Sequence, residues 1–392
     1  MMKSLKNIPG VIIVEGHIQG LANTRALGKE GIPIIVIDKN NCIARYSRYC
    51  KKFFKCPDYS SIEFIDFLIK IATKEKLEGW TILPSNDHAV FNIAKNKFEL
   101  QKYYKLITPD LSVINNIYDK ANLLRLAQKL EIPIPRTFFN LSANNLENKE
   151  ISFPLISKGR FGLSFFKTTG KKVFVSNNYS ELQKNLKYLQ EKIDSDSILN
   201  QELIPFDGKN RTLSFTAFCI DGQIKTFWIG EKVREHPIRF GTATAAQSTW
   251  NDALIESSSV LLKELSYTGV CEIEYLFDPR TKKYILIEIN ARTWLWVELA
   301  IKCGINYPIY IYNYLNNIPT NFPTSYKTNL NWVNIFTDIP FSISALIKKQ
   351  LKLKDFFKFY NRHTVYATFS SNDVLPSLMF FVILPYITVK RI

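Results

Sequence analysis

Two apolar runs joined by a single helix-length segment open the chain and restrict its fold more than any other feature. The run VIIV at 11–14 is followed by a turn at Gly16, by a helix-like stretch that ends at Gly31, and by the strand-like IPIIVID at 32–38. A strand, a helix and a second buried strand in this order form a right-handed parallel unit. We therefore predict an open parallel α/β sheet over residues 1–115.

The turn after the first strand also suggests a dinucleotide site. Asp38 closes the second strand about 20 residues after Gly16 and Gly20, where an acid that binds ribose would lie. The turn lacks the three-glycine fingerprint that brings the backbone against a pyrophosphate, and strand-ending Asp residues are common as caps. A nicotinamide-dependent oxidoreductase is therefore kept as an alternative.

Charge and cysteine content limit the partners and the cellular compartment that we expect for this protein. The chain has 51 Lys and Arg against 35 Asp and Glu, for a net charge of +16, which favours anionic partners. Because the basic residues are spread along the whole chain, we expect no nucleic-acid partner. Six cysteines without a CxxC pair, and no secretion signal, predict a reduced, cytoplasmic protein. The longest apolar run, 374–389, is too short to span a bilayer.

The segment from 150 to 204 has the pattern of a small α+β unit. Two strand-like stretches, FPLISK and KKVFVS, are joined by a loop that contains Gly159, Gly162 and Gly170, and a helix runs from Ser180 to about Ile193. We interpret the glycine-containing loop as a mobile lid.

A hairpin-like stretch at 269–292 carries the most informative side chains. Glu272 and Glu274 alternate with bulky residues on one strand, and Glu288 and Asn290 do so on the next. If the loop is 279–283, Glu274 opposes Glu288, Glu272 opposes Asn290 and Asp278 opposes Tyr284, with all these side chains on one face. Facing carboxylates destabilise a sheet unless a cation lies between them.

Oxygen ligands without His or Cys favour Mg²⁺ over Zn²⁺ at this hairpin. The alternative is a solvated hairpin whose charge is relieved by Lys282 and Lys283. Arg292, two residues further on, suits a clamp on a phosphoryl group, and a surface salt bridge with Glu298 is its alternative role.

With these features in order, the chain resembles the ATP-grasp carboxylate–amine ligases, especially the group that includes D-aspartate ligase. The resemblance rests on SRYCKKFFKCP, ILPSNDHAV, IYDKANLLRLAQKLEIPIPRT, QELIP and EINAR, and runs from about residue 10 to 320. It implies a pre-ATP-grasp Rossmann-like domain over 1–115 and an ATP-grasp domain over 116–322. Two α+β subdomains would hold ATP between them, a lid at 150–204 and a metal-binding part at 205–322, followed by an extension at 323–392.

The resemblance also implies roles for residues on the nucleotide side. Lys120 and Lys158 match the two lysines that contact ATP phosphates, and Glu202, Leu203 and Ile204 match the hinge that holds adenine. The departure on this side is Gly159, which follows Lys158 where proline is usual.

On the metal side, Glu274, Glu288 and Asn290 match the magnesium ligands, and Arg292 matches the catalytic arginine. Two Mg²⁺ ions are implied, with Mn²⁺ as a substitute.

The segment with Lys232 and Arg234 resembles the loop on the substrate side, where an arginine can hold a carboxylate. Arg211 and Arg239 are alternatives for that role. Glu235 departs from the pattern, because a neutral polar residue is more typical there.

The implied activity is ATP-dependent amide formation. A small-molecule carboxylate is phosphorylated to an acylphosphate, an amine attacks it, and ADP and phosphate leave. An amino acid and a cell-wall or surface-glycan precursor are the implied substrates. The alternative of another class is a non-catalytic nucleotide-binding or membrane scaffold.

The last 52 residues, 341–392, carry eight Lys and Arg against two Asp. Ile343, Leu346, Ile347 and Leu351 would share one side of a basic helix, followed by an apolar stretch. We favour docking of this segment on the core, and peripheral contact with an anionic membrane is the alternative.

Overall fold

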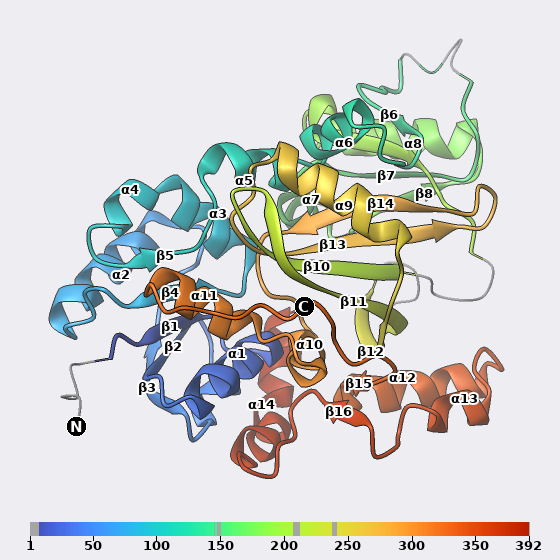
Figure 1. Cartoon of the computed structure of the whole chain (residues 1–392). Coiled ribbons are helices and arrows are strands. Elements are labelled where there is room, and N and C mark those ends of the chain that lie inside the picture. Colours follow the sequence, from blue (N-terminus) through green and yellow to red (C-terminus); the bar gives the residue numbers. More distant parts are fainter. Residues whose placement is uncertain (1–7, 145, 147–149, 207–211, 237–240, 392) are drawn as a thin grey trace, which may run out of the picture.

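The computed structural model describes residues 8–144, 146, 150–206, 212–236 and 241–391. Three sheets with flanking helices make up the fold (Figure 1). The N-terminal domain is blue in the figure and a small sheet with its helices is green. A large sheet, antiparallel except for its last pair of strands, runs through the centre and continues into the C-terminal segment.

The N-terminal domain is a five-stranded sheet with the order β3-β2-β1-β4-β5, and every neighbouring pair is parallel. The predicted open parallel sheet is thus confirmed. Its strands are β1 (Val11–Val14), β2 (Ile34–Asp38), β3 (Cys50–Lys55), β4 (Thr81–Pro84) and β5 (Lys105–Leu106). Its helices are α1 (Ile18–Lys29), η1 (Ala44–Tyr46), α2 (Ile62–Lys74), α3 (Asp87–Lys95), α4 (Lys97–Leu100) and α5 (Leu111–Tyr118).

Asp38 serves the first turn itself. One carboxylate oxygen accepts from the backbone N–H of Gly16 at 2.9 Å and the other from that of Asn40 at 2.8 Å. The residue is 1% exposed. A Cβ on Gly20 would lie 2.1 Å from the carbonyl oxygen of Glu15, so this glycine permits close packing of α1. Both observations favour a structural role over ribose binding.

The small sheet has the order β6-β9-β7-β8. Its strands are β6 (Thr137–Phe138), β7 (Leu155–Gly159), β8 (Phe174–Ser176) and β9 (Ile198–Glu202), with helices α6 (Lys120–Lys129), α7 (Gly162–Thr169), α8 (Tyr179–Gln190) and η2 (Ser195–Ser197). The predicted loop between β7 and β8 is wrong, because it is the helix α7. Gly162 begins this helix, Gly159 and Gly170 flank it, and Phe165 packs from it against Gly159.

The large sheet has the order β14-β13-β10-β11-β12-β15-β16. Its strands are β10 (Thr212–Ile220), β11 (Gln223–His236), β12 (Thr242–Thr249), β13 (Gly269–Asp278), β14 (Lys283–Asn290), β15 (Asn331–Val333) and β16 (Thr364–Tyr366). The helices α9 (Ala253–Glu264), α10 (Val297–Cys303) and α11 (Tyr307–Leu315) belong to the same part of the chain. Asp221 and Gly222, both at positive φ, form the tight turn between β10 and β11.

The register of the β13–β14 hairpin brings the acidic side chains together. Glu272 pairs with Asn290 and Glu274 pairs with Glu288, which confirms the predicted pairing. The predicted loop is wrong by one residue, because Asp278 pairs with Lys283 rather than with Tyr284. A β-bulge at Ile287 absorbs the difference.

The C-terminal segment is joined to the core at several points. It contains α12 (Ile335–Ile347), α13 (Leu353–Phe357) and α14 (Leu375–Arg391), and β15 and β16 extend the large sheet. Buried Asp373 accepts from Arg25 of α1 at 2.9 Å and from Ser47 at 2.7 Å. The segment is therefore docked on the core and is no separate extension beginning at 323.

The predicted helix through Leu351 is wrong. The helix α12 ends at Ile347, and Lys349, at positive φ, lies in the break before α13. In the described part of the chain, we find no helix whose length and apolar character would allow it to cross a membrane.

Candidate functional site

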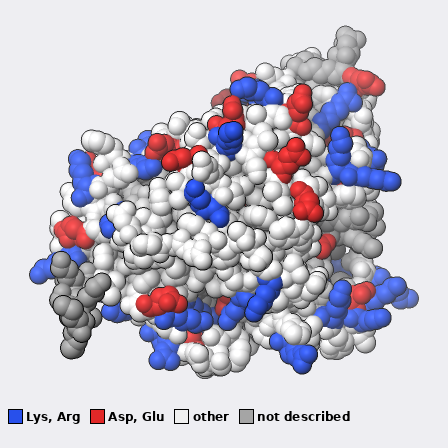
Figure 2. All heavy atoms as spheres, in the orientation of Figure 1, with Lys and Arg blue, Asp and Glu red and all other residues white. Residues whose placement is uncertain are grey.

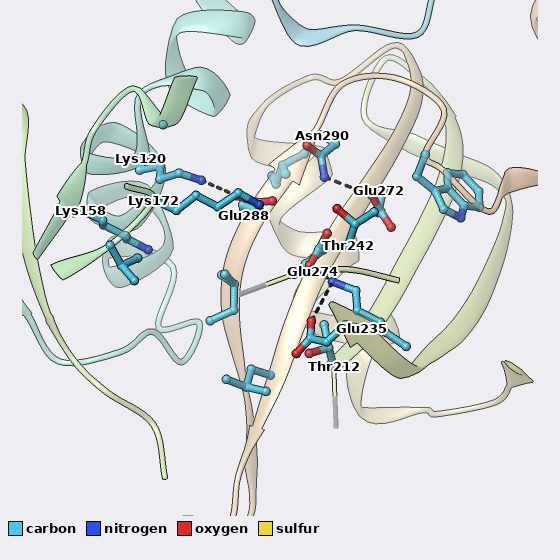
Figure 3. A pocket seen from close by; sticks show the side chains of 18 of the residues that line it. Lys120, Lys158, Lys172, Thr212, Glu235, Thr242, Glu272, Glu274, Glu288 and Asn290 are labelled. Carbon is cyan, nitrogen blue, oxygen red and sulfur yellow. Dashed lines mark hydrogen bonds and ion pairs between the residues drawn. The ribbon is translucent and has the colours of Figure 1, made fainter. Parts of the chain in front are cut away.

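A cavity of about 890 Å³ lies where the small sheet, the large sheet and the N-terminal domain meet. Ten of the eleven site residues predicted from the sequence line it. These are Lys120, Lys158, Glu202, Leu203, Ile204, Lys232, Glu274, Glu288, Asn290 and Arg292. Figure 3 shows lysines on one side of the cavity and the carboxylates of the hairpin on the other.

The lysines come from the part of the chain around the small sheet. Lys120 begins α6 and forms an ion pair with Glu288. Burial lowers the pKa of Lys120, but the Glu288 carboxylate more than offsets this, and the pKa is raised overall. Burial, together with the charge of Lys120, lowers the pKa of Lys158 to about 7. Lys172 also lines the cavity, and the sequence analysis missed it because it lies in a Lys-Lys pair typical of a solvated strand end.

The large sheet supplies the carboxylates. Glu272 is 3% exposed, and it accepts hydrogen bonds from Ser214 at 2.8 Å and from Asn290 at 3.0 Å. Burial and the nearby charge of Glu274 raise the pKa of Glu272. Glu274 forms a 3.2 Å ion pair with Lys232 of β11. The charge of Lys120 keeps the pKa of Glu288 low despite burial.

The donor set fits a hard divalent cation. Glu274, Glu288 and Asn290 present only carboxylate and amide oxygens from two neighbouring strands. Among the described residues, no three His, Cys, Asp or Glu side chains already converge as a metal cluster. Lys120 and Lys232 neutralise the two glutamates in this conformation. A bound Mg²⁺ would take the place of these lysines at the carboxylates.

Arg292 lies at the edge of the cavity and contacts the N-terminal domain. Its guanidinium donates to both carboxylate oxygens of Asp87, at 2.6 and 2.8 Å, and to the side-chain oxygen of Asn290 at 3.2 Å. The alternative pairing with Glu298 is wrong, because Glu298 is buried on α10 near Arg25 and Lys302. The sequence analysis missed Asp87. The polar Ser-Asn-Asp run after β4 was the available signal, because polar residues at the end of a parallel strand face the site edge of the sheet.

The predicted adenine hinge follows β9. The backbone N–H of Leu203 donates to the carbonyl of Pro154 at 2.9 Å, so it is occupied in this conformation. The Glu202 side chain pairs with Arg280. Leu276 and Phe277 line the cavity with Leu203 and Ile204, which gives it an apolar surface beside the predicted hinge.

Arg234 is the predicted site residue that does not line the cavity. It forms a bidentate ion pair with Asp338 of α12, at 2.8 and 2.7 Å. Asp338 is fully buried and also accepts from Tyr360 and Thr244. The structure therefore gives Arg234 a structural contact, while the alternatives Arg211 and Arg239 lie outside the described residues.

Lys232 and Glu235 belong to the segment predicted to lie on the substrate side. Both line the cavity, and their charged groups lie 4.0 Å apart. Burial lowers the pKa of Lys232, but Glu274 and Glu235 more than offset it and raise the pKa overall. Lys232 is therefore a fixed cation in the cavity.

Comparison with known proteins gives related sequences and structures. The carbamoyl-phosphate synthase L chain ATP-binding domain matches residues 234–304. D-aspartate ligase from Enterococcus faecium is 22% identical over 242 residues, covering 58% of each chain. The [butirosin acyl-carrier protein]–L-glutamate ligase from Niallia circulans is 22% identical over 236 residues, covering 57% of this chain and 54% of its own.

The similarity in structure extends further along the chain. Biotin carboxylase from Campylobacter jejuni superimposes with a TM-score of 0.66 at 17% identity, over 83% of this chain and 74% of its own. N5-carboxyaminoimidazole synthetase from Staphylococcus aureus gives 0.64 at 15% identity, over 84% and 82%. The chain has the ATP-grasp fold. L-amino acid ligase from Bacillus licheniformis gives 0.59 at 15% identity, over 79% and 75%.

The cavity lies between the small and the large sheet of this fold. The chain spans just over half the length of the curated relatives that it matches. A 2-oxoglutarate carboxylase domain from Hydrogenobacter thermophilus, with the same fold at 14% identity and a TM-score of 0.64, covers 83% of this chain and 74% of its own. That neighbour was solved with MgADP and bicarbonate.

Proposed function

We propose that this protein is an ATP- and Mg²⁺-dependent ligase that joins a carboxylate to an amine and releases ADP and phosphate. One observation carries the proposal: two lysines suited to phosphates face an oxygen-only hairpin across one cavity, with Arg292 beside it. Neither a plain nucleotide-binding scaffold nor a nicotinamide site needs this combination of groups.

Different residues of the cavity bind the phosphates and the metal. Lys120 and Lys158 bind the phosphates, and Lys120 exchanges Glu288 for a phosphate oxygen when ATP enters. Glu274, Glu288 and Asn290 would hold Mg²⁺, two ions in the full complement. When bound, the metal would supply positive charge to offset that of the phosphates.

Arg292 stabilises the phosphoryl group as it moves to the substrate carboxylate. The product is an acylphosphate, whose carbonyl carbon the amine attacks with loss of phosphate. Because acylphosphates hydrolyse in water, the site must be closed. The helix α7 covers the lysine side of the cavity and is our candidate lid.

An amino acid is the substrate class that we infer for one of the two partners. Three similar proteins carry names that include an amino acid: D-aspartate ligase, the L-glutamate ligase and L-amino acid ligase. The fixed cation Lys232 suits an acidic substrate. A cell-wall or surface-glycan precursor as the second substrate, and a cytoplasmic location, are part of the same proposal.

Thermal unfolding with ATP, with and without Mg²⁺, and with NAD(H) tests the nucleotide site in wild type, Lys158→Ala and Glu288→Gln. A ligand at about 100 times its Kd stabilises by about 2.7 kcal/mol, which is easily detected. We expect a Mg²⁺-dependent shift with ATP that both variants weaken. ADP release is then screened across amino acids. A shift with NAD(H) alone, or ATP binding without ADP release for any carboxylate and amine, would overturn the ligase proposal.

A further inference from the structure

Large apolar side chains exposed to solvent concentrate in the C-terminal segment. Among the described residues, eleven of the 24 exposed large apolar side chains fall within residues 339–382. A stretch of about one ninth of the chain thus holds nearly half of them. Contiguous exposed apolar surface of this kind marks an interaction site in a soluble protein.

The exposed side chains of α12 form one stripe. Ile339, Ile343 and Ile347 follow one another at four-residue spacing and are 40%, 49% and 78% exposed. Asp338 and Ser342 of the same helix are buried. The helix therefore faces the core with Asp338 and Ser342, and with the partly buried Ile335 and Phe336 of its first turn. Ile339, Ile343 and Ile347 are left facing outward.

The helix α14 continues this apolar surface. Leu378, Phe381 and Val382 are 57%, 63% and 67% exposed. Phe336, one turn before Ile339, contacts Phe381 with ring centroids 4.6 Å apart. The two helices thus touch through the partly buried Phe336 and the exposed Phe381. We call this surface, with Leu353 and Phe357 of α13, the C-terminal apolar surface.

Exposed lysines border this surface. Lys348, Lys349, Lys352, Lys354 and Lys358 are all exposed, within and beside α13. Figure 2 shows Lys and Arg gathered over α12 and α13 at the lower right. The acids do not balance them. Asp338 and Asp373 are buried in ion pairs, so Asp355 is the one exposed acid in the described residues from 335 to 383.

We propose that the C-terminal apolar surface binds an anionic lipid bilayer and places the enzyme at a membrane surface. Apolar side chains on interfacial helices enter the boundary between headgroups and acyl chains, while lysines contact the lipid phosphates. A second copy of this chain fits less well, because it would bring the same lysines face to face. The inference does not depend on the ligase activity.

Co-sedimentation of the full-length protein with vesicles tests this proposal. We expect pelleting with vesicles that contain phosphatidylglycerol and little with pure phosphatidylcholine. Replacing Lys348, Lys349 and Lys352 by Glu should weaken partitioning at least about fivefold for each lysine at low salt. The pair Ile343→Glu and Ile347→Glu should also abolish pelleting, since it removes the apolar contact.

Two matched controls separate the surface from charge and hydrophobicity in general. Replacing Lys70, Lys74 and Lys184 by Glu makes the same charge change at exposed sites elsewhere, and Ile62→Glu replaces an isoleucine that is 59% exposed. Both should pellet like wild type, and circular dichroism verifies the fold of every variant. Equal pelleting of test and control variants would overturn the proposal. Absence of vesicle binding by the wild type would also overturn it. If the wild type were instead a dimer and Ile343→Glu a monomer, the surface would be assigned to a second copy of this chain.

Discussion

Asp87 holds Arg292 across the boundary between the N-terminal domain and the large sheet, with both carboxylate oxygens accepting from the guanidinium. Asp87 is the first residue of α3, and its neighbour Asn86 caps that helix and donates to Glu15. The arginine proposed to stabilise the phosphoryl group is therefore oriented by a domain that contributes none of the proposed metal ligands.

Asp87→Asn should lower kcat while leaving ATP binding intact. The amide keeps the size of the side chain but loses its charge and one acceptor, so Arg292 is less well oriented toward the moving phosphoryl group. We expect a decrease in kcat of about tenfold to a hundredfold, with an unchanged KM for ATP, measured by ADP release. Asp110→Asn is the control, because it makes the same change at an exposed acid, the residue before α5. A further loss when Asp87→Asn is added to Arg292→Ala would contradict the positioning role.

The pKa of Lys158 predicts proton uptake on ATP binding. Burial and the charge of Lys120 lower this pKa to about 7 in the free protein. Phosphates favour the charged ammonium and raise the pKa, so above about pH 7 ATP brings a proton with it and its affinity falls as the pH rises. Calorimetry of ATP binding is done one pH unit above the pKa of Lys158, in two buffers of different ionisation enthalpy. It should show that binding takes up nearly one proton.

Lys158→Arg is the control for this titration, because arginine stays charged throughout the pH range. Its binding heat at the same pH should not depend on the buffer. If the wild-type heat were equally independent of the buffer, Lys158 would not be the phosphate ligand that changes its protonation.

Gly159→Ala should destabilise the small sheet and its lid helix. A Cβ at this position would lie 2.3 Å from the Cβ of Phe165, so α7 must move away from β7. Overpacking of this kind costs about 1–3 kcal/mol in the free energy of unfolding, measured with urea. Gly162→Ala is the matched variant, because its nearest neighbour is an atom of Lys120 at 3.8 Å. Equal stability of the two variants would mean that α7 does not depend on this contact.

Arg234→Ala should affect stability rather than substrate binding. The substitution leaves the buried Asp338 carboxylate without its cation, which costs about 3–5 kcal/mol in the free energy of unfolding. Substrate KM values should not change, because Arg234 does not line the cavity. Lys129→Ala, which removes an exposed ion pair with Glu264, should cost less than about 1 kcal/mol. A higher substrate KM with unaltered stability would restore the original role of Arg234.

The sequence was sufficient for the features that depend on local periodicity. Alternation with period two placed Glu272, Glu274, Glu288 and Asn290 on one face. The predicted pairing of these residues was right, although the loop in the structure is one residue shorter than the predicted loop. The bulge at Ile287 could not be foreseen, because it leaves the alternation near the ligands intact.

Long-range contacts were beyond the sequence. Nothing near Arg234 indicates that its partner Asp338 lies 104 residues away, and Asp87 is 205 residues from Arg292. The strands β15 and β16 have three residues each, too few for a period to be recognised. The helix α7 was taken for a loop because its three glycines were counted as breakers, whereas two of them flank the helix and one begins it.

The position of β15 and β16 in the large sheet has a consequence for biosynthesis. Until residue 333 has left the ribosome, β12 has an open edge, although the strands with the proposed metal ligands were made some 40 residues earlier. The edge of β15 then stays open until residue 366 completes β16. Unpaired strand edges recruit other chains. A nascent or prematurely terminated chain would therefore be prone to aggregate through β12, and we expect chaperone dependence to end only when the C-terminal strands have been added.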